Sequence, residues 1–428
     1  MPASSDGPVA PPPQVALRDL HRDFARIGVM SFGGPAAQIA LMHRLLVDDR
    51  RWLTEADYLR ALSFCMILPG PEAMQLATYA GWRLRGVAGG LIAGLWFTLP
   101  GALAILGLAA AYVHWGSAPV AQGMLLGLKA CVAAVVVQAL IRLAQRSLKT
   151  PAARMVAGLS FAALTLAGLP FPLVILIAAL WGARQAGPPA ALPAQVTAPS
   201  GPGLLRRAAP WAMAWLLPLA ALFLLADPFW AQMGLFFSKL ATLSFGGAYA
   251  LLAWMAQVLV NDFGWLNPAE MIDALGLAET TPGPLILVTA FAGFVAGFHH
   301  GGPGAALAGW ALTLWMVFTP CFLWVFAGAP LIEALTRRPR LAAALSAVSA
   351  AVVGVIASLA LWFALHVLFA QLLPGPLGLT LPDLASFRPV AALLMALAAG
   401  LLIWRGWPLL AVLGLCAALG AALGLGAG

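Results

Sequence analysis

The sequence predicts an all-α polytopic membrane protein built from two homologous repeats of inverted topology. Of its 428 residues, 62% are hydrophobic and 9% are charged, whereas soluble domains carry about 25% charged residues. Apolar runs of about 20 residues, the length of a membrane-spanning helix, recur along the whole chain. These runs are continuous rather than alternating, which excludes a transmembrane β-barrel. A set of rare residues that returns after 213 positions, from Ser31 to Ser244, predicts the duplication.

Each predicted repeat contains two glycine- and proline-rich breaks inside apolar surroundings. In the first repeat the breaks are Ser31, Phe32, Gly33 and Gly34, followed by Pro69, Gly70 and Pro71. In the second they are Ser244, Phe245, Gly246 and Gly247, followed by Pro282, Gly283 and Pro284. Because both breaks return in one register without a gap, the pattern indicates an internal duplication with broken or re-entrant helices at the FGG and PGP motifs.

The chain divides into five parts. Residues 1–16 are expected to form a disordered tail, since they include Pro8 and the run Pro11 to Pro13. They also lack the apolar core of a cleavable signal peptide. An N-terminal repeat (17–183) follows, then a cytoplasmic linker (184–208), an extra transmembrane helix (209–228) and a C-terminal repeat (229–428). Each repeat has about six segments, so one extra segment makes the second repeat enter the membrane from the opposite side. Inverted repeats with interrupted helices are typical of secondary transporters.

Basic residues at segment ends predict the orientation in the membrane, with a cytoplasmic N-terminus. Loop 48–60 carries three arginines, whereas its counterpart 261–273 has no Lys or Arg. Both facts agree with the rule if each broken pair forms a re-entrant hairpin, which puts the first loop inside and the second outside. Broken helices that span the membrane are the alternative.

The breaks are candidate anion-binding sites. A helix that restarts after a proline directs its positive N-terminal end at the break, and such ends bind anions. Hydroxyl groups add hydrogen-bond donors there, from Ser31, Ser244, Thr280 and Thr281. The alternative interpretation is that glycine and proline merely kink packed helices.

Ionisable residues inside apolar segments extend the candidate site. Arg26 and Lys239 each lie seven positions before a glycine of their own break, and Lys129 lies in the middle of an apolar run. Cations beside exposed amides would hold a compact anion, although they could instead extend to the membrane surface. Glu72 either stabilises a helix start or carries a coupling proton, and Gln75 could hydrogen-bond the substrate or simply pack.

Other functional classes have little support in the residues. The four cysteines lie far apart in apolar segments and no metal, redox or ATP-binding motif is present, so we expect no cofactor and no bound metal. The net charge of +8 is explained by membrane orientation and needs no nucleic acid. An intramembrane enzyme would require an acid pair or a Ser/His dyad, which the sequence does not show. A permissive ion channel remains an alternative.

The paired SFGG and PGP motifs, with the run from Leu68 to Gly86, resemble the chromate ion transporter family in its long-chain, bidomain form. The resemblance implies a bacterial inner-membrane protein that exports chromate from the cytoplasm and so confers chromate resistance. A cytoplasm-negative potential of 100 mV favours outward movement of an anion by about 2.3 kcal/mol per charge, so we expect export to be driven by membrane potential or an ion gradient. It places the family motifs on Phe32–Gly34, Phe245–Gly247 and the two PGP triplets. Sulfate is the expected competitor, and a sulfate or other oxyanion transporter or channel is the alternative. A homodimer in the lipid bilayer is a further expectation. The two repeats differ at two equivalent positions of these motifs: Pro35 of the first repeat corresponds to Ala248 of the second, and Glu72 corresponds to Leu285.

Overall fold

The computed structural model describes residues 15–185, 202–225, 227–245, 248–329, 339–375 and 380–426. The described chain is almost entirely helical, and five of its helices are long and apolar enough to cross a membrane. These spans are Glu72–Trp115, Pro119–Ser147, Gly203–Leu224, Leu285–Gly328 and Pro339–Leu368. The prediction of an all-α polytopic membrane protein is therefore confirmed in its main feature.

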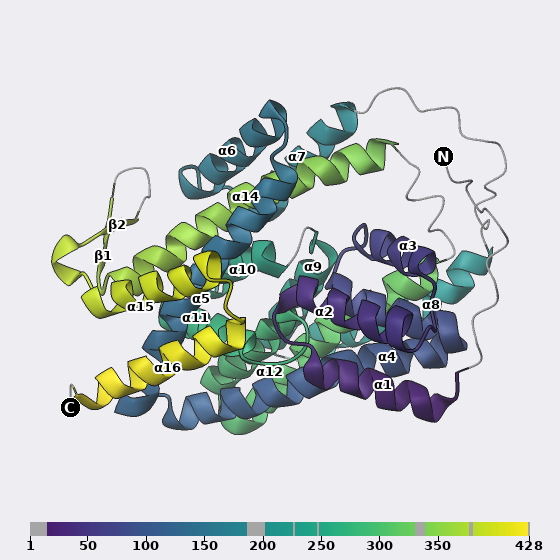
Figure 1. Cartoon of the computed structure of the whole chain (residues 1–428), viewed down its shortest axis with the longest axis horizontal. Helices are drawn as coiled ribbons and strands as arrows, with labels where there is room; N and C mark the ends of the chain where they lie inside the picture. Colours follow the sequence, from purple (N-terminus) through teal and green to yellow (C-terminus); the bar gives the residue numbers. More distant parts are fainter. Residues whose placement is uncertain are drawn as a thin grey trace.

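The described part of the first half, residues 15–185, forms seven α-helices and one π-helical turn (Figure 1). In order they are α1 (Leu17–Met30), α2 (Gly34–His43), η1 (Arg44–Asp49), α3 (Glu55–Cys65), α4 (Glu72–Trp115), α5 (Pro119–Ser147), α6 (Pro151–Thr165) and α7 (Phe171–Gln185).

The second half begins with α8 (Pro202–Leu225), which precedes a similar succession of elements. These are α9 (Pro228–Thr242), α10 (Ala248–Ala256), η2 (Gln257–Asp262), α11 (Pro268–Glu279), η3 (Leu285–Leu287), α12 (Val288–Gly328) and α14 (Pro339–Leu368). The chain ends with β1 (Leu372–Pro374), β2 (Thr380–Pro382), η6 (Leu384–Ser386), α15 (Pro389–Ala399), η7 (Gly400–Trp404) and α16 (Leu409–Gly426).

Local structure follows the 213-residue register closely. The π-helical turns η1 and η2 begin at positions 44 and 257, α3 and α11 begin at 55 and 268, and the helices after the PGP motifs begin at 72 and 285. Both long helices, α4 and α12, also contain a kink at a glycine with positive φ, Gly86 (62°) and Gly302 (75°), although Gly302 lies three residues beyond the 213-residue register. Equivalent stretches of sequence therefore adopt equivalent backbone conformations.

Capping residues fix where the hairpin helices begin. The Thr54 side chain accepts a hydrogen bond from the Asp57 backbone amide at the start of α3. At the same place in the second half, Asn267 and Glu270 form a reciprocal capping box on α11. Each cap satisfies backbone groups that the first turn of a helix leaves without partners, and so holds the preceding loop in a defined position.

The two halves exchange their final helices. Helices α6 and α7 of the first half pack on α14, whereas α15 and α16 of the second half pack on α5 (Figure 1). Glycine permits the close approach, because a Cβ at Gly127 of α5 would lie 1.9 Å from the Cys416 carbonyl of α16. On the other side, a Cβ at Gly354 would lie 2.2 Å from the Ala157 carbonyl. Helices α5 and α14 therefore form a shared centre, called here the scaffold helices.

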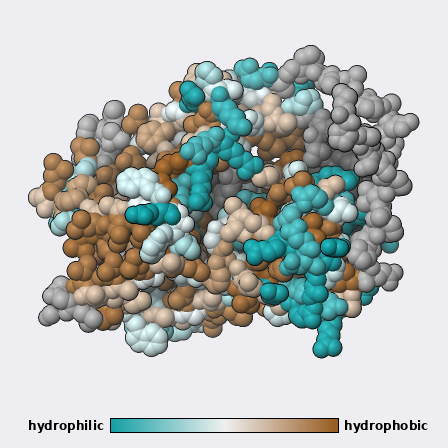
Figure 2. All heavy atoms as spheres, in the orientation of Figure 1, coloured by the Kyte–Doolittle hydropathy of each residue, from teal (hydrophilic) through white to brown (hydrophobic). Residues whose placement is uncertain are grey.

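The surface matches a membrane environment. Large apolar side chains are exposed on several helices, including Leu393 of α15 and Leu224 of α8. Figure 2 shows hydrophobic atoms over the α15–α16 side of the molecule and hydrophilic atoms over the side formed by α1, α2 and α3. The hydrophilic end coincides with the basic segment that the sequence places in the cytoplasm.

Two details differ from the sequence-based expectations. Helix α8 begins at Pro202, inside the stretch predicted as linker, because proline is well tolerated in the first turn of a helix. Residues 1–14 and 186–201, which include most of the predicted tail and linker, lie outside the described residues. The all-α prediction also missed a small antiparallel hairpin formed by β1 and β2, where prolines at the strand ends prevent a continued helix.

Candidate functional site

The breaks of the two halves are joined by two matching hydrogen bonds. The Gly70 amide of the first PGP motif donates to the Ser244 carbonyl at 2.9 Å. The Gly283 amide of the second PGP motif donates to the Ser31 carbonyl at 2.8 Å. The breaks therefore meet in space, as the repeated register predicts, and each PGP motif contacts the SFGG motif of the other half.

Glycine is required at the centre of both PGP motifs. Gly70 has a φ of +124° and Gly283 a φ of +91°, values that other residues rarely adopt. Each motif also lies against the long helix of the opposite half. A Cβ at Gly70 would lie 3.0 Å from Cys321 Sγ of α12, and a Cβ at Gly101 of α4 would lie 2.0 Å from the Pro282 carbonyl. The motifs thus have no room for larger side chains.

A small cavity lies where the breaks meet. Its volume is about 10 Å³, which is room for about one water molecule and too little for a tetrahedral oxyanion. Its lining is Pro35, Gln38, Gly70, Pro71, Glu72, Ala73, Ser244, Pro284, Leu285 and Ile286. Because α2, α4 and η3 begin among these residues, three positive helix ends converge on the cavity. This arrangement favours an anion, although the Glu72 carboxylate, which also lines it, would repel one when charged.

Two glutamines fix the backbone around the cavity. The Gln38 side-chain amide donates to the Ser31 carbonyl (3.1 Å) and the Gly283 carbonyl (2.6 Å). Gln75 donates to the Pro69 carbonyl at 2.6 Å. The side-chain oxygens of both glutamines are buried without a hydrogen-bond partner among the described residues. Gln75 was a predicted site residue, whereas Gln38 was missed; its signal is a lone polar residue in the apolar turn after Pro35.

The predicted hydroxyl donors mostly bond to their own helices. Ser31 donates to the Ile27 carbonyl (2.6 Å), and Thr280 and Thr281 donate to carbonyls of α11 at 2.7 and 2.8 Å. Ser244 is buried and lines the cavity. In this conformation the backbone amides and Ser244, rather than the other three hydroxyls, are the groups best placed for an anion.

The remaining motif residues shape the turns. The amides of Phe32 and Phe245 bond to the carbonyls two residues earlier, each at 2.9 Å, so both SFGG motifs begin with the same turn. Gly33 and Gly34 have φ values of +85° and +79°, which allow α2 to restart. Gly246 and Gly247 lie outside the described residues.

None of the three predicted cations lines the described cavity. Arg26 of α1 and Lys239 of α9 are exposed. The Lys129 ammonium is 3.1 Å from Asp273 Oδ2, and the Tyr112 hydroxyl donates to the same oxygen at 3.0 Å. Sequence reasoning did not single out Asp273 as the partner of Lys129.

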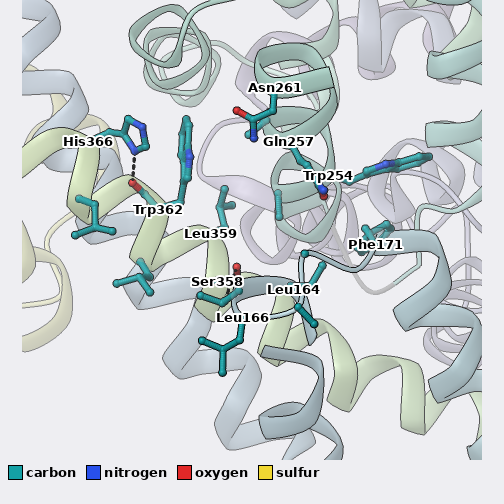
Figure 3. A pocket seen from close by; sticks show the side chains of 17 residues that line it. Leu164, Leu166, Phe171, Trp254, Gln257, Asn261, Ser358, Leu359, Trp362 and His366 are labelled. Carbon is teal, nitrogen blue, oxygen red and sulfur yellow. Dashed lines mark hydrogen bonds between the residues drawn. The ribbon is translucent and has the colours of Figure 1, made fainter. Parts of the chain in front are cut away.

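A second and larger cavity lies between the α6–α7 loop, α10–η2 and α14 (Figure 3). Its volume is about 540 Å³, and its polar lining includes Gln257, Asn261 and His366 among apolar and aromatic side chains. No Lys, Arg, Asp or Glu is among its lining residues. This cavity therefore lacks the charge that a dianion site requires.

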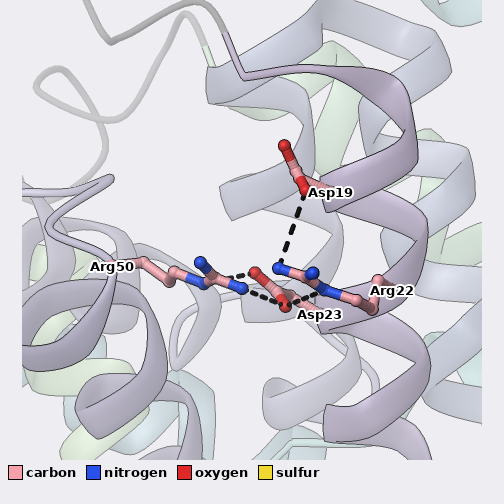
Figure 4. Close-up of polar contacts among 4 residues, drawn as sticks. All are labelled: Asp19, Arg22, Asp23 and Arg50. Carbon is pink, nitrogen blue, oxygen red and sulfur yellow. Dashed lines mark hydrogen bonds and ion pairs between the residues drawn. The ribbon is translucent and has the colours of Figure 1, made fainter.

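An ion-pair cluster joins the hydrophilic end of α1 to the loop after η1 (Figure 4). The Arg50 guanidinium donates a hydrogen bond from Nη2 to Oδ1 of the buried Asp23 at 2.7 Å, and its Nε lies 2.6 Å from Asp23 Oδ2 in an ion pair. Arg22 approaches Asp23 at 3.3 Å. The hydrogen bond between Arg50 and Asp23 raises the pKa of Arg50 above its usual value. At the equivalent positions of the second half, Phe236 and Phe263 meet edge to face at 6.0 Å. The same junction is thus ionic in one half and aromatic in the other.

The described residues hold no group of three or more His, Cys, Asp or Glu side chains arranged to bind a metal ion. His299 and His300 lie in α12, and their side chains are near the carboxylates of Glu270 (3.2 Å) and Asp227 (3.6 Å).

Comparisons with known proteins give one consistent family. The chromate transporter family model matches residues 18–183 and 231–421. The chain is 31% identical over 357 residues to the chromate transport protein of Cupriavidus metallidurans, with 82% of this chain and 83% of the relative covered. It is also 31% identical over 371 residues to the chromate transport protein of Pseudomonas aeruginosa, with 81% of each covered. A probable chromate transport protein of Synechococcus elongatus is similar at 31% over 350 residues, covering 81% and 84%. No solved structure matches the chain.

Proposed function

We propose that this chain, which belongs to the chromate transporter family and transports chromate, exports the anion from the cytoplasm by alternating access between two inverted repeats. The observation that carries the proposal is the crossed pairing of the breaks, Gly70 to Ser244 and Gly283 to Ser31. It brings positive helix ends from both halves to one small cavity. A dianion is the ligand that such a convergence favours most.

The crossed hydrogen bonds suggest how the site opens. Both amides are bonded to carbonyls while the cavity is small. If the halves separate, each amide loses its carbonyl and can donate to an oxygen of chromate instead. Four oxygens at tetrahedral positions allow one anion to bind donors from both halves at once. We infer that this exchange of carbonyl for chromate offsets part of the cost of removing the dianion from water.

The lengths of the short helices favour re-entrant hairpins. Helix α2 (10 residues) with its continuation η1 (6 residues) covers residues 34–49, and α10 (9 residues) with η2 (6 residues) covers 248–262. Helices α3 and α11 have 11 and 12 residues, whereas a spanning helix needs about 20. A hairpin that enters and leaves on one face agrees with the basic loop 48–60 and the loop 261–273 that lacks Lys and Arg. We propose a cytoplasmic N-terminus and a bacterial inner membrane on the same charge pattern.

The membrane potential is sufficient to drive export. Each charge that crosses 100 mV changes the free energy by about 2.3 kcal/mol, so a dianion leaving a negative cytoplasm gains about 4.6 kcal/mol. That free energy corresponds to a concentration ratio of about 2,000. Chromate resistance would follow, because the cytoplasmic concentration falls without an ATP-driven step. Sulfate has the same charge and shape and is expected to compete.

The test is radiolabelled chromate flux in proteoliposomes of purified protein under imposed potassium diffusion potentials. We expect chromate to accumulate on the positive side, with sulfate as a weaker competitor, and protein-free liposomes give the background. The proposal fails if flux does not respond to potential or does not exceed that background. A preference for sulfate over chromate would assign the alternative substrate.

A further inference from the structure

The two hairpins of the chain are docked differently. The second hairpin (α10–η2–α11) packs on both scaffold helices, α10 on α14 and α11 on α5. The first hairpin (α2–η1–α3) packs on α4, and the described residues show no comparable contact of α2 with α5 or of α3 with α14. Figure 1 shows α10 and α11 beside the scaffold helices, with α2 and α3 on the side of α1 and α4.

A buried ion pair joins the docked hairpin to the scaffold. Lys129 of α5 lies 3.1 Å from Asp273 Oδ2 of α11, and their side chains are 16% and 3% exposed. The Tyr112 hydroxyl of α4 donates to the same oxygen. The other oxygen, Asp273 Oδ1, is buried without a hydrogen-bond partner among the described residues. If α11 left while Lys129 stayed buried, the ammonium would lose its partner, which is costly, so the pair opposes departure of the hairpin.

The first hairpin has no equivalent pair. The position in α3 that corresponds to Asp273 is Arg60, which is exposed and pairs with Asp57 of its own helix at 3.5 Å. The residue of α14 that corresponds to Lys129 by the run of sequence around it is Ser346. An ion pair could therefore hold the second hairpin to its scaffold helix but not the first.

Helices α5 and α11 also approach closely beside this ion pair. Gly276 lies one turn beyond Asp273 in α11, and a Cβ at this position would be 3.4 Å from the Leu128 Cβ of α5. A Cβ at position 276 would therefore make only an ordinary van der Waals contact with α5, so positions 128 and 276 can report whether the helices separate without disturbing their packing.

We propose that Lys129 and Asp273 form a one-sided lock that holds the second hairpin on α5 and must break during each transport cycle, as the hairpin leaves and the first hairpin docks on the scaffold. The proposal rests on the proposed function, because it assigns the two docked positions to the two states of an alternating-access cycle. It makes Lys129 a positioning residue in the present state, which accounts for its absence from the cavity lining.

The first experiment tests whether the hairpin must move. Leu128→Cys and Gly276→Cys are introduced together after replacement of Cys65, Cys131, Cys321 and Cys416 by alanine. Their Cβ separation is close to that of a disulfide, about 3.5–4.5 Å. We expect oxidation to stop chromate flux and a reductant to restore it, while either single-cysteine variant is unaffected. Cross-linked protein that transports at the rate of the reduced protein would overturn the proposal.

The second experiment tests the ion pair with a readout that does not depend on transport. Gly276→Cys is labelled from the external side with a membrane-impermeant maleimide. We expect Asp273→Asn to increase the labelling rate about tenfold, and the swap Lys129→Asp with Asp273→Lys to return it toward the original value. If Asp273→Asn fails to insert, Lys129→Met with Asp273→Leu removes both charges and keeps the site apolar. Labelling unchanged by these substitutions would overturn the lock.

The two conclusions fail separately. Absence of chromate flux in the unsubstituted protein rejects the proposed function, whatever the labelling shows. Normal chromate flux with a hairpin that stays docked, or with labelling indifferent to the charges, rejects only the lock.

Discussion

Replacement of Gly101 by alanine tests whether the second PGP motif must lie against α4. The added Cβ would be 2.0 Å from the Pro282 carbonyl, whereas an ordinary contact is about 3.4 Å or more. Helix α4 and the motif must therefore separate by about 1.4 Å, which would break the 2.8 Å hydrogen bond from Gly283 to Ser31 if the motif moves. Overpacking costs about 1–3 kcal/mol and the lost hydrogen bond about 1 kcal/mol.

Gly107→Ala is the matched control. It lies in the same helix, and a Cβ there meets nothing within 4 Å, so the better helix propensity of alanine makes this variant neutral or more stable by up to about 1 kcal/mol. We expect Gly101→Ala to lower the thermal unfolding midpoint in detergent and to reduce chromate flux about tenfold. If the two variants show the same flux and unfolding midpoint, the motif does not need its position against α4.

Three further predictions follow from individual contacts. Arg50→Gln removes the main partner of a buried carboxylate, so we expect a loss of about 1–2 kcal/mol in urea unfolding, with Arg51→Gln close to unchanged; equal stability of the two variants would contradict the reasoning. Gln38→Leu removes two hydrogen bonds at the cavity and should cost about 1–3 kcal/mol and most of the chromate flux. Gln122→Leu removes one exposed hydrogen bond, to the Gly116 carbonyl, which water can replace, so it should cost less than about 1 kcal/mol and leave the flux unchanged. Glu72→Gln removes a carboxylate from the cavity lining; we expect a lower KM for chromate, because repulsion disappears. A KM like that of the unsubstituted protein would assign Glu72 only a structural role.

Local sequence signals predicted the parts of the site that depend on backbone conformation. Glycine and proline determine where α2 and α4 restart, so the ends at Gly34 and Glu72 could be placed from the motifs. The repeated register predicted that the breaks meet, and two backbone hydrogen bonds join them. Such features depend on residues close together in the chain.

Features that depend on packing between distant helices could not be predicted in the same way. The pairing of Lys129 with Asp273 requires α5 to lie against α11. The exposed positions of Arg26 and Lys239 depend on which faces α1 and α9 turn inward, and a seven-residue spacing from a glycine does not determine that. Their roles in chromate binding stay predictions, and loss of flux in Lys239→Ala with normal insertion is the expected result.

The exchange of terminal helices between the two halves also could not be predicted from the sequence. Apolar runs predicted the segments that became α6, α7, α15 and α16, but composition says nothing of which half they pack on. The same holds for the second cavity, whose lining comes from α10, α14 and the α6–α7 loop. Periodicity identifies an element, whereas its partner depends on side-chain fit across the whole bundle.

The most direct test of the account is the steady-state distribution of radiolabelled chromate across proteoliposomes as the imposed potential is varied. Transport of a dianion by this chain predicts a tenfold change in the chromate ratio for about each 30 mV, at symmetrical pH and without ATP. A chromate ratio that stays near one at every potential would contradict potential-driven export.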